Sequence, residues 1–556
     1  MRKNKAIRII LYILAAFVLT IAGLFLYYKV VTKVNEPKIP DVEKVSFERT
    51  LSGSNMNSCE HGWLRKEREG WWVMYLEGSP YEVGFAHGLL AQDLMAGQEK
   101  AFLERLAELI PSKFYQRFML GFVRFFNRNL DQNVKEEYRE EIFGISRFAS
   151  PEFTFMGPAY ARMLNYHAAH DLGHAVQNMN LVACTAFGAW NGRTPDSSLI
   201  IGRNFDFYIN DDFAKDKILC FIKPDSGYRF AMVTWAGFTG VVSGMNEKGL
   251  VITLNAAKSS IPAGAKTPVS LLAREILQYA SNIDEAYCIA QSRQTFVAEA
   301  FLVASAADHK AVVIEKTPDD IAIYDPDTNF IILTNHFQSD KFFNDPLNVE
   351  NRQNETSVYR HDRVQELLDE NPVVTPEVAA GILRDYKGLG GKDIGLGNEK
   401  AVNQFIAHHS VIFEPGKLRL WIAGPPWQLG EYWMYSLDSL RDSAKLEFDF
   451  TTELHGVYTE GHKGITRKIP ADTLLNTGTY QNLTRYRALA ARIESGIYTE
   501  GDADSLIRYN PEFFHTYRVL GDYFGAKGEG QRAEGYYRQA MEKEAPSAAE
   551  RRAVGQ

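Results

Sequence analysis

One cysteine in the chain, Cys184, is followed closely by a cation and a carboxylate that can support nucleophilic chemistry. These are Arg203 and Asp206, both in the segment GRNFDF. A nearby guanidinium lowers the pKa of a thiol, the thiolate is the reactive form of cysteine, and a carboxylate can orient a cationic partner. The pattern indicates a cysteine nucleophile. The alternative is that Cys184 is only a small apolar residue of a buried strand.

A predicted hairpin positions these residues. Two apolar runs, 184–190 and 198–207, flank the turn residues Asn191-Gly192. Arg203 and Asp206 are three residues apart, so strict alternation would point them to opposite faces of a strand. A strand end between them is needed to bring both to the same end of the hairpin, next to the cysteine.

Alternating strands and helices continue along the chain. Upstream of the hairpin we expect a strand at 71–77, a helix at 82–94 and a helical region at 98–148. Downstream we expect hairpins turning at 224–227 and 246–249, helices near 268–279, 283–290, 358–368 and after Thr375, and strands near 298–306, 310–316, 321–325, 330–336, 408–415 and 418–424. Paired antiparallel strands on both sides of a helical pair predict an α+β fold with two sheets between helices.

Several short motifs occur in a fixed order around this hairpin. They are EGSPYEVGFAHG (77–88), ACTAF with GRNFDF (183–207), GFTGVVSGMNEKGLVITLNAA (237–257), LTNHF (333–337), SVYRHDR (357–363) and LWIAGPPWQLGEYWMYSLD (420–438). In order and spacing this set resembles the Cys-type N-terminal-nucleophile hydrolases of the penicillin acyltransferase group. It is more distantly similar to choloylglycine hydrolases and N-acylethanolamine amidases. The resemblance runs from about Trp72 to Leu440.

The resemblance implies a fold and a mechanism. The fold would be a four-layer αββα N-terminal-nucleophile hydrolase sandwich. Family members are made as inactive precursors that cut themselves before the cysteine, which here means between Ala183 and Cys184. The freed α-amine, with an ordinary pKa near 8, would then act as the general base for its own thiol. The reaction needs no metal or other cofactor.

The resemblance also assigns roles to further residues. Arg203 matches the arginine near the thiolate, and Asp206 the aspartate that holds the new α-amine. Asn255 and Asn335 match two asparagines that supply oxyanion donors. Arg360 matches a further site arginine, although Arg363 lies three residues on and is an alternative.

A histidine-rich segment just before the expected cleavage point is a separate candidate. On a helix, His167, His170, Asp171 and His174 would share one face. Such a face can bind zinc or copper, assist precursor processing, line the pocket or simply pack. Gly173 weakens the helix prediction.

The N-terminus predicts a membrane anchor. Residues 9–28 form an apolar run of about 20 residues, which is long enough to span a bilayer. Basic residues cluster before it, so we expect the N-terminus in the cytoplasm and the rest of the chain, including the catalytic part, on the other side. A cleaved signal peptide is the alternative.

Length and charge limit the remaining possibilities. The chain has 556 residues, is 45% hydrophobic and carries a formal net charge of -8, so we expect a globular protein that does not bind nucleic acid. We expect four parts: an anchor and linker (1–40), a mostly helical precursor segment (41–183), a catalytic core (184–445) and a C-terminal extension (446–556). The extension contains Tyr517, Leu520, Gly521, Phe524, Ala533, Tyr537 and Ala540 at the spacing of a tetratricopeptide repeat. This helical tail either binds a protein partner or packs on the main domain.

These observations lead to one principal functional prediction and two alternatives. We expect a membrane-anchored, self-processing amidohydrolase or acyltransferase that cleaves a linear N-acyl bond through an acyl-thioester on Cys184, with a small N-acyl or lipid-derived substrate. The first alternative is a phospholipase B-like lipid hydrolase on the same fold. The second is a non-catalytic, membrane-tethered scaffold that uses its helical tail.

Overall fold

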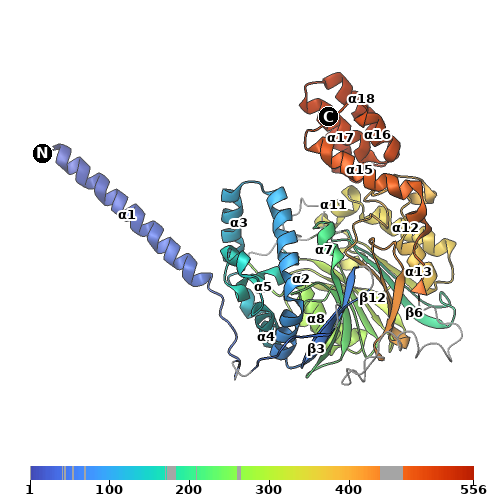
Figure 1. The fold of residues 1–556 in the computed structure, drawn as a ribbon, viewed down its shortest axis with the longest axis horizontal. Coiled ribbons are helices and arrows are strands. Elements are labelled where there is room, and N and C mark those ends of the chain that lie inside the picture. Colours follow the sequence, from blue (N-terminus) through green and yellow to red (C-terminus); the bar gives the residue numbers. More distant parts are fainter. Residues whose placement is uncertain are drawn as a thin grey trace.

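The computed structural model describes residues 2–40, 42, 45–52, 55–67, 70–168, 171, 183–207, 209–258, 264–438 and 468–555. Two β-sheets form its centre, with helices around them (Figure 1). The larger sheet contains, in spatial order, β1 (Thr50–Ser52), β2 (Met56–Cys59), β3 (Gly62–Lys66), β4 (Trp71–Gly78), β7 (Lys217–Pro224), β8 (Phe230–Thr234), β9 (Ser243–Asn246), β10 (Leu250–Ala256), β11 (Glu299–Ser305), β12 (Lys310–Lys316) and β13 (Ile321–Tyr324). The smaller sheet contains β14 (Phe330–Leu333), β5 (Thr185–Asn191), β6 (Ser197–Phe205), β15 (His409–Glu414), β16 (Arg419–Ala423), β17 (Tyr432–Ser436) and β18 (Lys468–Ile469).

Helices fill most of the remaining described chain. They are α1 (Arg2–Val31), α2 (Pro80–Leu109), α3 (Lys113–Phe126), α4 (Glu136–Ser146), α5 (Ala159–His167), α7 (Asp211–Lys215), α8 (Val269–Tyr279), α9 (Ile283–Ser292), α10 (Asp340–Phe343), α11 (Pro346–Asn354), α12 (Ser357–Glu370), α13 (Pro376–Leu383), α15 (Gly478–Glu494), α16 (Asp502–Tyr509), α17 (Phe514–Ala526), α18 (Gly530–Met541) and α19 (Ala548–Gly555). Short 3₁₀ turns lie at Leu130–Asn133, Pro151–Met156, Leu389–Gly391, Pro415–Lys417 and Thr473–Asn476. Mixed helix and strand content confirms the α+β class.

The segment before Cys184 contributes strands to the larger sheet as well as helices. Strand β4 pairs with β7 in parallel, with Trp71 opposite Lys217, whereas the other described neighbouring strands are antiparallel. The expected helices at 82–94 and from 98 onward are one continuous helix, α2, because Gly97 sits in open space and does not interrupt it. The N- and C-terminal sides of the expected cleavage point therefore share a single sheet.

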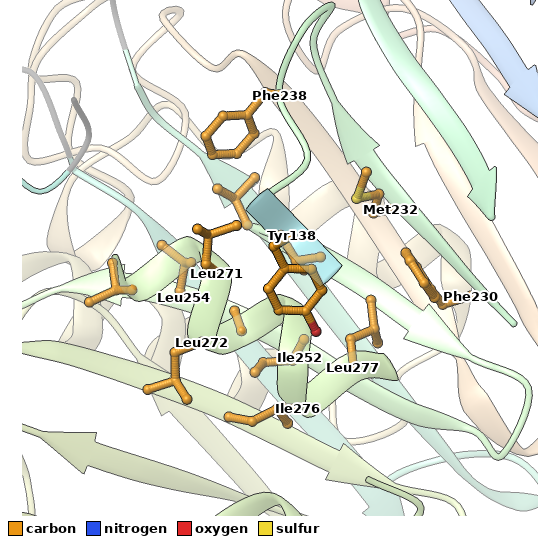
Figure 2. Close-up of a cluster of buried hydrophobic side chains, with 14 of the residues drawn as sticks. Tyr138, Phe230, Met232, Phe238, Ile252, Leu254, Leu271, Leu272, Ile276 and Leu277 are labelled. Atoms are coloured by element: carbon orange, nitrogen blue, oxygen red, sulfur yellow. The ribbon is translucent and has the colours of Figure 1, made fainter. Parts of the chain in front are cut away.

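The three largest hydrophobic clusters among the described residues join the sheets to each other and to the helices. One lies between the sheets and contains apolar side chains from both, such as Leu219, Val251, Ile201 and Val411. A second joins α2, α4, α5, α8 and α9 to the larger sheet. Figure 2 shows part of it, where Tyr138 of α4 and Leu272 of α8 belong to one cluster over the strands. The third joins α12 and α13 to the smaller sheet.

The expected hairpins are present, and the first of them carries the predicted site. Strands β5 and β6 are antiparallel, with Ala186 opposite Arg203 and Thr185 opposite Asn204. Strand β6 ends at Phe205, immediately before Asp206. The pairs β7–β8 and β9–β10 form the other two hairpins, and β16–β17 the later strand pair.

The two ends of the chain are arranged differently. Helix α1 extends away from the other elements (Figure 1), and its segment Ile7–Val31 is long and apolar enough to cross a membrane. The C-terminal helices instead contact the core, since the Asn510 side chain exchanges hydrogen bonds of 3.1 and 2.8 Å with the backbone of Leu396. Helices α17 and α18 approach closely at Gly521, where a Cβ atom would lie 2.3 Å from the Tyr537 ring.

Candidate active site

The predicted cleavage point lies at the open end of the β5–β6 hairpin, where β5 begins and β6 ends. Cys184 immediately precedes β5 and is fully buried. The Ala183 N–H donates to the Asp206 carbonyl over 3.0 Å, which aligns the two chain segments beyond the last residue of β6. Because β6 has ended at Phe205, Asp206 is released from strand alternation and lies at the same end of the hairpin as Arg203.

The Cys184 thiol is protonated in this environment. Burial raises its pKa to about 11, and the nearby charges of Asp206 and Glu299 act in the same direction. The Arg203 guanidinium and a hydrogen bond from the Asp206 backbone lower it, but burial outweighs both. The expected lowering of the thiol pKa by arginine is therefore present but is not the net effect in the uncut chain.

The Arg203 guanidinium joins the cysteine to the larger sheet. It donates to the carbonyl oxygens of Val242 and Leu254 and to the Ser243 hydroxyl. Its charge also lowers the pKa of the Cys184 thiol. The Ser243 hydroxyl in turn lies 2.8 Å from His409 Nε2 on β15. Arg203 thus bridges the two sheets directly beside the sulfur.

Arg360 of α12 holds the backbone at the cysteine from the other side. Its Nη1 donates to the Cys184 carbonyl over 2.6 Å and to Thr185 Oγ1 over 2.9 Å, and its Nη2 donates to Asn335 Oδ1 over 2.7 Å. Arg363, one turn further along the helix, instead forms an ion pair with Asp385 at 2.9 Å. Of the two arginines left open by the sequence, the structure brings Arg360 to the site.

The two candidate asparagines lie close together at the ends of β10 and β14. Asn255 donates its side-chain amide to the carbonyls of Leu333 and Thr334, over 3.2 and 2.9 Å, so both of its N–H groups are used. Asn335 donates to the Ala256 carbonyl over 3.0 Å and accepts from Arg360, which leaves one N–H of its amide for another acceptor. Asn335 is therefore the better placed of the two to donate to an oxyanion.

The Asp206 carboxylate is buried without a hydrogen-bond donor. Within the described ranges, neither of its oxygens has a hydrogen-bond partner, and the residue is fully buried. Burial raises the pKa of Asp206 to about 7, although the charges of Arg360 and Arg203 lower it. Such a group is costly to bury and needs an explanation.

Sequence reasoning missed two residues that contact the cleavage point. Gln404, which precedes β15, donates its side-chain amide to the Ala183 carbonyl over 3.4 Å. Thr185 accepts from Arg360 through its hydroxyl. Thr185 follows the cysteine directly and could have been found from its position, whereas Gln404 is remote in sequence and stands in no motif that we recognised.

The histidine-rich segment is only partly described. His167 donates from Nδ1 to the Met163 carbonyl over 2.8 Å and accepts the Thr239 N–H at Nε2 over 2.9 Å, so both ring nitrogens are used within the protein. Asp171 accepts the Val269 N–H over 3.0 Å. His170 and His174 lie outside the described residues. Within the described ranges, no group of three His, Cys, Asp or Glu side chains is arranged to hold a metal ion.

An apolar pocket adjoins the site. It is lined by aromatic and aliphatic side chains and by a few polar groups: Met95, Gln98, Glu99, Phe102, Met163, Tyr166, Phe207, Ile209, Phe213, Trp235, Ala236, Gly237 and Phe238. Phe207 directly follows Asp206, and its ring packs against Phe205 with centroids 5.7 Å apart. The chain that leaves the site therefore forms one wall of the pocket.

Two neutral histidines position the pocket loop 235–240. His87 Nε2 accepts the Gly237 N–H over 2.9 Å, and His167 accepts from Thr239 as described above. Burial lowers the pKa of His87 to about 3 and that of His167 to about 4, so each imidazole is neutral at pH 7 and can accept a backbone proton. Both histidines come from the segment before Cys184, which thereby shapes the pocket of the segment after it.

With this geometry in place, comparison with known proteins is informative. Residues 192–423 match the family model described as acyl-coenzyme A:6-aminopenicillanic acid acyl-transferase. Residues 192–423 are therefore similar to that acyltransferase family. The match includes Arg203, Asp206, Asn255, Asn335 and Arg360, and it begins just after Cys184. The resemblance expected from the motifs is confirmed for this segment, which is similar to a family of acyl-transferring enzymes.

Individual relatives are more distant. An uncharacterized protein of Archaeoglobus fulgidus is 27% identical over 292 residues, which are 48% of this chain and 48% of that protein. Protein dcd1B of Dictyostelium discoideum is 23% identical over 277 residues, covering 46% of this chain and 53% of its own. The chain thus spans about half the length of the curated relatives it matches.

Two hydrolases of known structure match part of the chain. The Caenorhabditis elegans ortholog of N-acylethanolamine-hydrolyzing acid amidase has 20% identity and a TM-score of 0.30, and the match covers 42% of this chain and 93% of that one. The conjugated bile acid hydrolase of Clostridium perfringens has 13% identity and a TM-score of 0.31, with 46% and 93% covered.

Proposed function

We propose that this chain is a self-processing cysteine amidohydrolase or acyltransferase. It cuts itself between Ala183 and Cys184 and then cleaves a linear N-acyl bond through an acyl-thioester on Cys184. The proposal rests on the acyltransferase segment and on the groups gathered around the sulfur. It includes the four-layer αββα arrangement, which agrees with the three largest hydrophobic clusters.

The observation that carries the proposal is the Asp206 carboxylate. It is buried beside Cys184, and no described donor hydrogen-bonds it. Cutting the Ala183–Cys184 bond creates an α-amine at Cys184, which brings an N–H donor that the uncut chain lacks. A carboxylate that has no donor before the cut and gains one afterward explains why its burial is tolerated.

Self-cleavage uses groups that already contact the peptide bond. Cys184 Sγ attacks the Ala183 carbonyl carbon, the C–N bond breaks as the thiol proton passes to the nitrogen, and a thioester forms. Gln404 donates to the Ala183 carbonyl oxygen, where negative charge develops. Water then adds its oxygen to the Ala183 carbonyl carbon and returns a proton to the sulfur, which releases residue 183 as a carboxylate.

In turnover the new α-amine is the general base. It takes the thiol proton as the sulfur attacks a substrate carbonyl, and it passes that proton to the leaving amine. The free N–H of Asn335 is available to the oxyanion, and Arg360 fixes both Asn335 and the Cys184 backbone. Water or a second amine then accepts the acyl group from sulfur.

The pocket suggests the class of substrate. Its walls carry Phe102, Phe207, Phe213 and Trp235, which suit a long or aromatic apolar group. Of its lining residues, Gln98 and Glu99 have buried acceptor atoms, Oε1 and Oε2 respectively, without a donor among the described residues. A substrate with an apolar acyl chain and a hydroxyl or ammonium donor fits both features, and it includes lipid-derived N-acyl amines.

The proposal extends to the location of the enzyme. Helix α1 would anchor the chain in a membrane with its basic N-terminus in the cytoplasm and the catalytic part on the opposite side. The tetratricopeptide-like tail remains a prediction, and a protein partner at its helices is part of that prediction.

Amide turnover by the purified full chain tests the proposal. N-acyl amines with acyl chains of increasing length are incubated with the protein, and the released amine is measured. Cys184→Ala should abolish both chain cutting and turnover, whereas Cys184→Ser should keep slow cutting. Cys220→Ala is the matched control, because Cys220 is equally buried but lies in β7.

The assay tests both the cysteine mechanism and the class of substrate. If Cys184→Ala releases amine at the wild-type rate, the cysteine mechanism is wrong. If phospholipids are cleaved and N-acyl amines are not, the phospholipase B-like alternative replaces the amidase.

A further inference from the structure

Helix α3 (Lys113–Phe126) exposes an unusual number of aromatic rings. Phe114, Phe118 and Phe122 are 81%, 61% and 53% exposed, and Tyr115 and Phe125 are also exposed. At 3.6 residues per turn, positions 114, 118, 122 and 125 lie within about 80° of one another, so they form a single stripe along the helix. No residue of α3 is buried. We call residues 114, 115, 118, 122 and 125 the aromatic stripe.

The charge around the aromatic stripe has one sign. Residues 110–130 contain Lys113, Arg117, Arg124 and Arg128 and no aspartate or glutamate, although the whole chain has a formal net charge of -8. Lys113 and Arg117 are exposed. A helix with aromatic residues on one face and basic residues beside it has the composition of helices that lie in the interface of an anionic bilayer.

A contact with α1 gives this helix its position. Tyr28, near the end of the apolar segment Ile7–Val31, donates its hydroxyl to the Gly121 carbonyl of α3 over 3.0 Å. Its ring stacks on Phe125, a member of the aromatic stripe, with centroids 6.5 Å apart. Tyrosine at the end of a membrane span lies at the level of the lipid headgroups. Helix α3 therefore touches the anchor at the depth where an interfacial helix would lie.

We propose that α3 docks on the membrane surface beside α1 and inserts its aromatic stripe among the lipids of an anionic phospholipid bilayer. This inference requires α1 to be a membrane anchor but does not depend on the reaction at Cys184. The helix follows α2, and α2 carries the pocket residues Met95, Gln98, Glu99 and Phe102. Docking of α3 thus holds the pocket close to the bilayer, and a lipid-derived substrate has a short path to it.

Photolabelling by lipid tests the inference in the full chain. The protein is reconstituted in nanodiscs of phosphatidylcholine and phosphatidylglycerol that contain a lipid with a diazirine in its acyl chain. After illumination, labelled peptides are mapped by mass spectrometry. We expect lipid adducts on α1 and on α3, and none on the exposed helix α18 (Gly530–Met541). The Phe114→Ser, Phe118→Ser, Phe122→Ser variant should lose the α3 adducts and keep those on α1, since these side chains are more than half exposed and their replacement removes little buried surface.

The outcomes test the docking of α3 and the anchoring by α1 separately. Adducts on α1 with none on α3 would overturn the docking of α3 and leave the anchor in place. An absence of adducts on α1 would overturn the anchor itself. Adducts on α3 that persist in the triple-serine variant would show that the aromatic stripe does not carry the interaction, which contradicts the proposal. Adducts on α3 that disappear in the variant would support it.

Discussion

Two buried sites in this protein contain arginine side chains, and they differ in whether the carboxylate near the arginine has a hydrogen-bond donor. Beside the pocket loop, Arg274 of α8 forms an ion pair with Glu141 of α4 at 3.1 Å and also donates to the Thr239 carbonyl over 3.0 Å. Beside Cys184, Arg203 and Arg360 donate mainly to carbonyl oxygens, and the Asp206 carboxylate, whose pKa both arginines lower, accepts no hydrogen bond from a described donor. The first centre pairs its buried charges directly. The second leaves a carboxylate without a described donor. We call the Arg274 site the complete centre and the Cys184 site the open centre.

The difference indicates that the Arg274 site stabilises the fold, whereas the Cys184 site serves the reaction. A buried ion pair whose members satisfy each other fixes the packing of two elements, here α8 and α4 under the loop 235–240. A buried carboxylate without donors weakens the fold and survives because something else requires it. We assign that requirement to the α-amine that forms when the chain is cut. Variants in the two centres should therefore fail in different ways.

The largest expected effect is on stability, in the complete centre. Glu141→Gln leaves the Arg274 guanidinium buried without its counter-charge, and breaking a buried pair in this way costs about 3–5 kcal/mol of unfolding free energy. Denaturant unfolding measures the loss. Chain cutting in the molecules that do fold should be normal. A stable Glu141→Gln protein that fails to cut would erase the distinction between the centres.

The next effect is on catalysis, in the open centre. Arg360→Lys removes the planar fork that joins the Cys184 carbonyl to Asn335, and loss of such a donor lowers kcat by about 10²-fold. Arg363→Lys is the matched control, because Arg363 lies one turn away on the same helix and pairs with Asp385 instead. Equal losses of kcat in the two variants would mean that Arg360 acts only through folding.

A smaller effect is on the pH dependence of the unfolding free energy, which should differ between the two centres. Asp206 titrates near 7 in the fold and near 3.8 when unfolded, so its contribution to stability is fully present below about pH 4 and is lost as the pH rises to 7. In a Cys184→Ala chain, which stays uncut, Asp206→Asn should flatten this decline by at least about 1 kcal/mol. Unfolding curves at pH 4 and pH 7 measure it. A decline unchanged by Asp206→Asn would show that the carboxylate is ionised in the precursor.

The last effect has the opposite dependence on pH and lies beside the complete centre, at His167. His167 titrates near 4 in the fold and near 6.5 when unfolded, so its contribution is fully present above pH 6.5 and is lost as the pH falls toward 4. His167→Phe should remove this acid sensitivity and cost about 1–3 kcal/mol, because the Thr239 N–H loses its acceptor. The KM for apolar substrates should also rise, since that N–H positions the pocket loop. Acid sensitivity that persists in His167→Phe would point to other histidines.

Part of the site was predictable from sequence because Cys184, Arg203 and Asp206 lie on or directly beside one hairpin. The apolar runs before and after Asn191-Gly192 predicted β5 and β6, and the three-residue spacing of Arg203 and Asp206 required the strand to end between them, as it does. The motif order predicted Asn255, Asn335 and Arg360 as site residues, and Arg360 does link Asn335 to the Cys184 carbonyl. The choice between Arg360 and Arg363 could not be made, because both positions suit the same helix and only packing decides which one faces the site.

Other features were invisible for physical reasons. Gln404 contacts Ala183 across more than two hundred residues, and no local pattern marks such a contact. The rise of the thiol pKa could not be foreseen, because burial depends on the whole fold and here outweighs the arginine beside the sulfur. The contribution of β1–β4 to the larger sheet was also hidden, since the pairing of β4 with β7 joins segments far apart in the chain.

The identity of the N-terminal residue in the mature protein tests the central claim most directly. The full chain is isolated from membranes, and its fragments are analysed by N-terminal sequencing and intact mass. The account predicts two chains, 1–183 and 184–556, the second beginning at Cys184 with a free amine, and only the uncut chain in Cys184→Ala. An intact chain that hydrolyses N-acyl amines, or a new N-terminus at any other residue, would contradict it.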